Sequence, residues 1–65
     1  MDVARLAQLL HETADHHGPY EQSAPPHHWW DWYAAYMTAR EAGSSSEEAS
    51  KAAGLYMETI GHAGA

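Results

Sequence analysis

Residues 27–37 read HHWWDWYAAYM, and this stretch decides the fold that the sequence predicts. At about 100° per residue, its large apolar side chains gather on one broad arc of an α-helix, with Trp30 at the margin. The arc consists of Trp29, Trp32, Tyr33, Tyr36 and Met37. We therefore predict a helix over about 26–42 with an unusually wide apolar face, which the following glycine ends.

Another helix precedes this one. Residues 2–17 place apolar side chains at the three- and four-residue spacing of an amphipathic helix, with Asp2 available to cap it. The Gly-Pro pair at 18–19 is expected to end it, since proline cannot continue the hydrogen-bond ladder. The Pro-Pro pair at 25–26 suits the first turn of the next helix, where the missing N–H groups need no partner.

The third helix has the clearest start signal. Either Ser44 with Glu47 or Ser45 with Glu48 has the spacing of a capping box, in which each side chain bonds the backbone N–H of the other residue. An alanine-rich stripe follows, and a glycine comes directly after it. These patterns predict a helix over about 46–60.

Length and composition set the class of the protein. A chain of 65 residues forms one domain, residues 1–65, and buries only about 60% of the surface of its unfolded chain. No cysteine is present, which excludes disulfides and thiolate metal sites, and strand patterns are missing. We predict an all-α, three-helix arrangement that is completed by dimerisation.

The charge of the chain limits its partners. Nine acidic and three basic residues give a formal charge of −6 with neutral histidines. A nucleic-acid partner needs a clustered basic face, so none is expected. No run of about 18 apolar residues is present, so we expect no membrane segment and a cytoplasmic protein.

The six histidines raise the question of a metal site. HETADHH (11–17) contains two histidine–carboxylate pairs spaced four residues apart, and HHWWD (27–31) repeats that spacing. If the first two helices pack antiparallel, these stretches lie at the same end of the bundle. The candidate ligands of a divalent metal are His11, Glu12, Asp15, His16, His27, His28 and Asp31.

Ordinary polar surface is the competing interpretation of these histidines. His16 and His17 suit the negative C-terminal end of the first helix, and no full signature such as HExxH is present. No glycine-rich phosphate loop, nucleophile elbow or serine with an identifiable base occurs either. We therefore expect no catalytic activity and no obligatory cofactor.

The aromatic residues indicate contacts beyond a single chain. Three short helices cannot easily bury them all, and tryptophan and tyrosine are enriched in protein interfaces. The predicted core and interface residues are Trp29, Trp32, Tyr33, Tyr36, Met37 and Tyr56. Arg40 falls inside the aromatic arc, so we expect a structural role for it: a snorkelling side chain, an ion pair with another helix, or a cation over a ring.

Residues 9–57 resemble a short helical module of actinobacterial proteins. The matching elements are HETADHHGPYE, WWDWYAAY and EEASKAAGLYM. The module occurs as small chains and as a C-terminal extension of glyoxalase or bleomycin-resistance-like proteins of the vicinal oxygen chelate superfamily. The βαβββ units that carry the active site of that superfamily are missing here, so no catalytic residue is carried over. The resemblance implies a bacterial accessory or assembly module.

The sequence as a whole favours an interaction or oligomerisation module that forms a homodimer or docks on another protein domain. The alternative is a metal- or small-ligand-binding protein that uses the histidine and carboxylate side chains. A third hypothesis is sequestration of a cationic aromatic compound between acidic groups and tryptophans.

Overall fold

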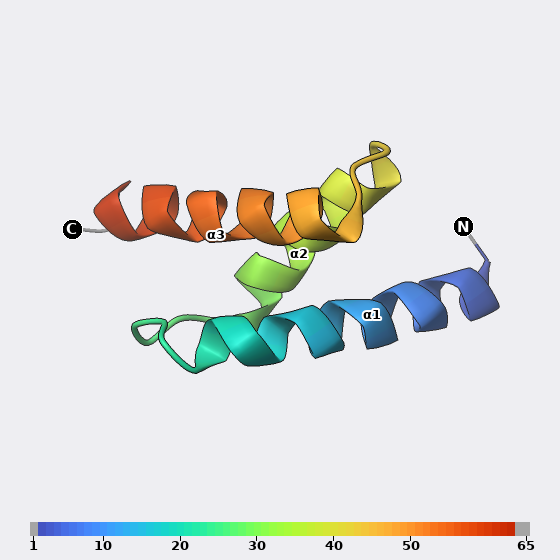
Figure 1. The fold of residues 1–65 in the computed structure, drawn as a ribbon, viewed down its shortest axis with the longest axis horizontal. Helices are drawn as coiled ribbons and strands as arrows, with labels where there is room; N and C mark the ends of the chain where they lie inside the picture. The colour runs from blue at the N-terminus through green and yellow to red at the C-terminus, as the bar shows by residue number, and fades with distance from the viewer. Residues whose placement is uncertain (1, 64–65) are drawn as a thin grey trace.

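The computed structural model describes residues 2–63, which form three helices and no strand. Helix α1 spans Val3–Glu21, α2 spans Trp29–Glu41 and α3 spans Ser46–Ala63. Figure 1 shows α2 crossing between α1 and α3, and α2 packs against both, whereas α1 and α3 barely meet. This arrangement confirms the all-α, three-helix prediction. None of the described helices is both long and apolar enough to cross a bilayer.

Helix α1 starts as predicted but ends later. The Asp2 side chain caps it by accepting a hydrogen bond from the backbone N–H of Arg5 at 2.7 Å. The predicted end at residue 17 is wrong, because Pro19 lies inside the helix, which runs on to Glu21. In this exposed last turn proline removes only one backbone hydrogen bond, and the added residues bring Tyr20 onto the core.

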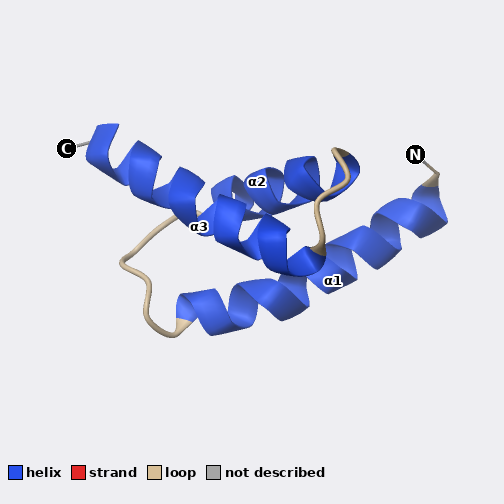
Figure 2. Ribbon diagram, turned by 45° about the horizontal axis from the view of Figure 1, so that its top comes forward, coloured by secondary structure: helices blue, strands red, loops and turns tan. Residues whose placement is uncertain are grey.

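Helix α2 begins three residues later than predicted. Its N-cap is His28, with an extended backbone (φ −90°, ψ 125°), so Pro25 and Pro26 belong to the connection rather than to the first turn. A residue that precedes a proline is disfavoured in the helical region of φ/ψ space. Pro25 precedes Pro26, so it is disfavoured there too. Two connections join the three helices, and the one over 22–28 is the longer. The two connections lie at opposite ends of the molecule (Figure 2).

Gly43 ends α2 as expected. Its φ of +106° is the only positive φ among the described residues, and it lets the chain turn back. The N–H of Gly43 bonds the carbonyl of Arg40, and the N–H of Ser44 bonds that of Ala39, both at 3.0 Å. These two bonds form a Schellman motif.

The capping box of α3 is the pair Ser45 and Glu48. The N–H of Ser45 donates to the Glu48 carboxylate at 2.9 Å, and the N–H of Glu48 donates to the Ser45 hydroxyl at 3.2 Å. The predicted end at residue 60 is too early, since α3 passes Gly61 and reaches Ala63. Glycine permits a helix to end but does not force it, and Gly61 keeps a negative φ.

The core lies where α2 meets its two neighbours. The buried apolar residues are Leu9, Trp32, Tyr36, Ala49, Ala53 and Met57. Trp32 and Tyr36 stack with ring centroids 5.3 Å apart, and the small alanines of α3 leave room for them. Of the predicted core and interface set, Tyr33 and Met37 pack at the edge of this cluster. Trp29 and Tyr56 lie outside it, with 55% and 45% of their surface exposed.

Candidate metal centre

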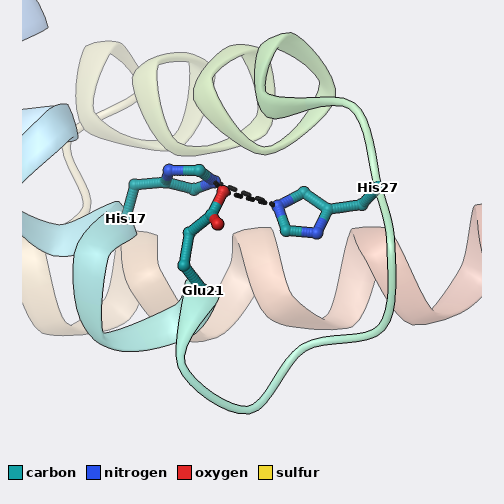
Figure 3. Close-up of side chains that lie close together, drawn as sticks. All are labelled: His17, Glu21 and His27. Atoms are coloured by element: carbon teal, nitrogen blue, oxygen red, sulfur yellow. Dashed lines mark hydrogen bonds and ion pairs between the residues drawn. The ribbon is translucent and has the colours of Figure 1, made fainter.

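Two histidines and one glutamate converge where α1 ends and the connection returns to α2. The Nε2 atoms of His17 and His27 are 3.1 Å apart, and Oε1 of Glu21 lies 3.3 Å from the first and 3.4 Å from the second. Figure 3 shows the two rings nearly perpendicular, with a nitrogen of each directed at the other and the carboxylate beside them. His17 and Glu21 are one turn apart on α1, and His27 comes from the segment just before α2.

The two imidazole rings are enclosed, whereas the carboxylate is open to solvent. The side chains of His17 and His27 are 10% and 9% exposed, and that of Glu21 is 52% exposed. The rings of Trp32, Tyr33 and Tyr20 surround His17 at centroid distances of 5.1, 5.3 and 6.1 Å. This aromatic wall holds the His17 ring in one orientation.

The hydrogen bonding of His27 determines its tautomer. Its Nδ1 lies 2.9 Å from the carbonyl oxygen of Pro25, which can only accept, so Nδ1 carries the proton. The Nε2 atom of His27 is then the acceptor, and it receives the hydrogen bond from Nε2 of His17 at 3.1 Å. A ring N–H donated to a backbone carbonyl is the usual outer support of a metal-bound histidine.

The protonation of His17 follows from its burial and from its contact with His27. Burial lowers the pKa of its imidazole below the usual 6.5; the carboxylate of Glu21 opposes this effect, and a charge on His27 adds to it. The lowered pKa favours the neutral ring at pH 7. Because the His27 proton lies on Nδ1, Nε2 of His17 donates their 3.1 Å hydrogen bond, and a bound metal ion would take the place of that proton. The site therefore combines two imidazoles with one carboxylate.

The spacing of the three atoms fits a transition-metal ion. In a tetrahedral site with bonds of about 2.05 Å, neighbouring ligand atoms are roughly 3.3 Å apart. The three distances here, 3.1, 3.3 and 3.4 Å, bracket this value. Two histidines with one carboxylate are a ligand set of zinc and of non-haem iron, and without thiolates the site is suited to ions of intermediate softness.

Of the seven ligands predicted from the sequence, the structure brings only His27 into this cluster. The pair His11 and Asp15 does approach to 3.5 Å, but the two side chains are 82% and 69% exposed and no third ligand joins them within residues 2–61. The ring of His16 stacks on Tyr36, with centroids 5.4 Å apart.

Glu12 is engaged elsewhere. Its carboxylate accepts hydrogen bonds from the Tyr36 hydroxyl at 2.6 Å and from Nε and Nη2 of Arg40 at 2.7 and 3.2 Å. The bonds from Arg40, and then that from Tyr36, lower the pKa of Glu12 to about 2. Glu12 and Arg40 therefore form an ion pair between two helices, which is one of the three structural roles predicted for Arg40. This ion pair joins α1 to α2.

The remaining predicted ligands lie beside the cluster. His28 stacks on Trp30 with centroids 4.5 Å apart. Asp31 and His28 line a small cavity of about 190 Å³, which Met57 and Ile60 close from α3. Because His27 lies outside α2, its predicted helical spacing to Asp31 does not apply.

The convergence of this cluster at the end of α1 and the start of α2 agrees with the expected meeting of histidines and carboxylates there, but two of its three residues are not among the predicted ligands. The sequence pattern places His17 at the helix C-terminus and Glu21 beyond the helix. Yet they are four residues apart, the same spacing that singled out the other pairs. This spacing carries a signal only if the helix continues past Pro19, which it does.

Comparison with family models, with curated proteins and with solved structures finds no match to this chain. The resemblance of residues 9–57 to an actinobacterial helical module therefore stays a prediction.

Proposed function

We propose that this chain is a small helical metal-binding protein that holds one divalent transition-metal ion at His17, Glu21 and His27. The observation that carries the proposal is the convergence of three ligand atoms within 3.4 Å of one another, with the His27 lone pair set by the Pro25 carbonyl. Of the three hypotheses drawn from the sequence, this convergence favours the metal-binding one.

The ion would also stabilise the fold. It would join the last turn of α1 to the far end of the connection over 22–28, which otherwise has few backbone hydrogen bonds of its own. A domain of this size has a marginal core, and a metal bound only by the folded chain adds its binding energy to folding.

Isothermal titration of the metal-free chain with zinc tests the proposal. We expect one zinc per chain for the wild type and a large loss of affinity in His27→Ala and in Glu21→Gln, which replaces a side chain that is 52% exposed with one of the same shape. The matched control is His11→Ala, which removes an exposed histidine from a pair of the same spacing. Wild-type zinc binding that survives in Glu21→Gln and His27→Ala, or is lost in His11→Ala, would refute the proposal.

A second candidate function, formation of a homodimer, is favoured by the exposed aromatic residues. Trp29 and Trp30 expose 55% and 52% of their surface, and Leu55 and Tyr56 on α3 expose 59% and 45%. An apolar groove of about 440 Å³ between α2 and α3, lined mostly by alanines, lies next to Tyr56. Large exposed apolar residues of this kind are typical of protein contacts.

Sedimentation velocity over a range of protein concentrations tests this candidate. We expect a dimer for the wild type and a monomer for Tyr56→Glu, which places a charge at the edge of the groove. Asp15→Asn, on the exposed surface of α1, is the control. A monomeric wild type at every concentration would rule out the homodimer. A bacterial, cytoplasmic setting is proposed here only on the resemblance of residues 9–57.

A further inference from the structure

The ligand set of the proposed centre is incomplete. Within residues 2–61, three metal-ligating side chains converge and no fourth joins them. A zinc or cobalt ion with four ligands therefore has one position that the described side chains do not fill. Structural zinc sites have four protein ligands, whereas sites with three retain a position for an exchangeable ligand.

The geometry places this position toward solvent. The rings of Trp32 and Tyr33 lie against His17 and close that side of it, and the ring of Tyr20 lies against His27. The open side is that of Glu21, whose side chain is 52% exposed although it lies 3.3 and 3.4 Å from the two buried nitrogens. A ligand from solution can therefore approach the ion alongside this carboxylate.

Charge determines which ligand the position favours. Two neutral imidazoles and one carboxylate leave a divalent ion with one net positive charge. Within the ligand set His17, Glu21 and His27, the positive charge comes from the ion, which would attract an anion. The nine acidic residues of the chain oppose an anion of higher charge.

We infer that a metal ion held by His17, Glu21 and His27 keeps an open coordination position on its solvent side and takes a small monovalent anion there. This inference rests on the proposed metal-binding function. It goes beyond that function because it makes the centre a ligand-binding site and not a structural clamp alone.

Cobalt provides the probe, because its visible absorption bands respond to each change of ligand. The metal-free chain is loaded with cobalt, its metal content is measured after gel filtration, and the spectrum is followed during titration with sodium azide. We expect one cobalt per chain and a band shift that saturates with azide. His11→Ala, outside the centre, should give the same titration, and His27→Ala should bind little cobalt.

The outcomes separate the two proposals. Cobalt that binds at one per chain but whose spectrum does not respond to azide overturns the open position and leaves metal binding intact. One cobalt per two chains, with a dimer in sedimentation, also overturns it, because a second copy then fills the position. A wild type that binds no cobalt overturns both proposals.

Discussion

Arg40 holds the Glu12 carboxylate with two hydrogen bonds, from Nε at 2.7 Å and from Nη2 at 3.2 Å, across the interface of α1 and α2. A third donor of the same guanidinium, Nη1, reaches the carbonyl of Ser44 at 2.9 Å, in the turn before α3. One side chain of α2 thus binds both α1 and the turn that leads into α3. Such forked, charge-assisted pairs are stronger than single hydrogen bonds.

Arg40→Ala is therefore expected to lower the melting temperature by several degrees while leaving zinc affinity unchanged. The variant leaves the Glu12 carboxylate with Tyr36 as its remaining hydrogen-bond donor. Thermal unfolding followed by circular dichroism and zinc titration are the two measurements. Loss of zinc binding with unchanged stability would contradict this assignment. Arg5→Ala, which removes an exposed arginine side chain on α1, is the control.

The lowered pKa of the Glu12 carboxylate leads to a prediction of how the free energy of unfolding changes in acid. Its hydrogen bonds to Arg40 and Tyr36 lower its pKa from the ordinary 4.5 to about 2 in the folded chain. The unfolded chain takes up the proton first, so this contribution is fully present above pH 4.5 and is lost as the pH falls toward about 2. Urea unfolding at several pH values between these limits should show the loss, and Glu12→Gln should remove this part of the dependence.

Trp32 is expected to be essential for folding. Its side chain is 1% exposed, and Trp32→Ala should cost roughly 3–5 kcal/mol, which is comparable to the total stability of a domain this small. Circular dichroism should therefore show a largely unfolded variant. Trp29→Ala is the matched control, because Trp29 is 55% exposed and its loss should leave the helices formed. A folded Trp32→Ala with wild-type stability would show that the core has been misassigned.

Two glycines should respond to alanine with opposite signs. Gly43 has a φ of +106°, so Gly43→Ala strains the turn and should destabilise the chain by about 1–2 kcal/mol. Gly54 lies inside α3 with open space where a Cβ would stand, so Gly54→Ala should stabilise it by about 0.4–1 kcal/mol. Urea unfolding measures both changes. A stabilising Gly43→Ala would contradict the Schellman turn, and a destabilising Gly54→Ala would contradict the open space at that position.

Removal of metal should destabilise the chain. At a free zinc concentration about 100 times Kd, binding contributes about 2.7 kcal/mol, and a chelator should reverse the rise in melting temperature. The stabilisation should fade in acid, because imidazole ligands must be neutral. Burial lowers the pKa of His17 below 6.5, which delays the protonation of this ligand as the pH falls. A zinc effect that persists unchanged in His27→Ala would show that the ion binds elsewhere.

Local signals in the sequence were sufficient for the helices themselves. The apolar spacing, the Asp2 cap and the Ser45–Glu48 capping box act within one or two turns, and they are present in the structure. Gly43 is also a local signal, because its positive φ forms a turn among residues that are close together in the sequence. The predicted ends at residues 17 and 60 were wrong, because a proline or glycine near a helix end weakens the helix without having to end it.

The sequence by itself determined three helices, the turn that ends α2, and the end of the bundle where histidines and carboxylates meet. Only the tertiary structure decided which of these histidines and carboxylates contact one another. Glu12 is engaged by a residue 28 positions further along the chain, and His17 pairs with a histidine 10 positions away, across the connection. No periodicity encodes either contact, because each depends on the path of a proline-rich connection and on the packing of α1 against α2.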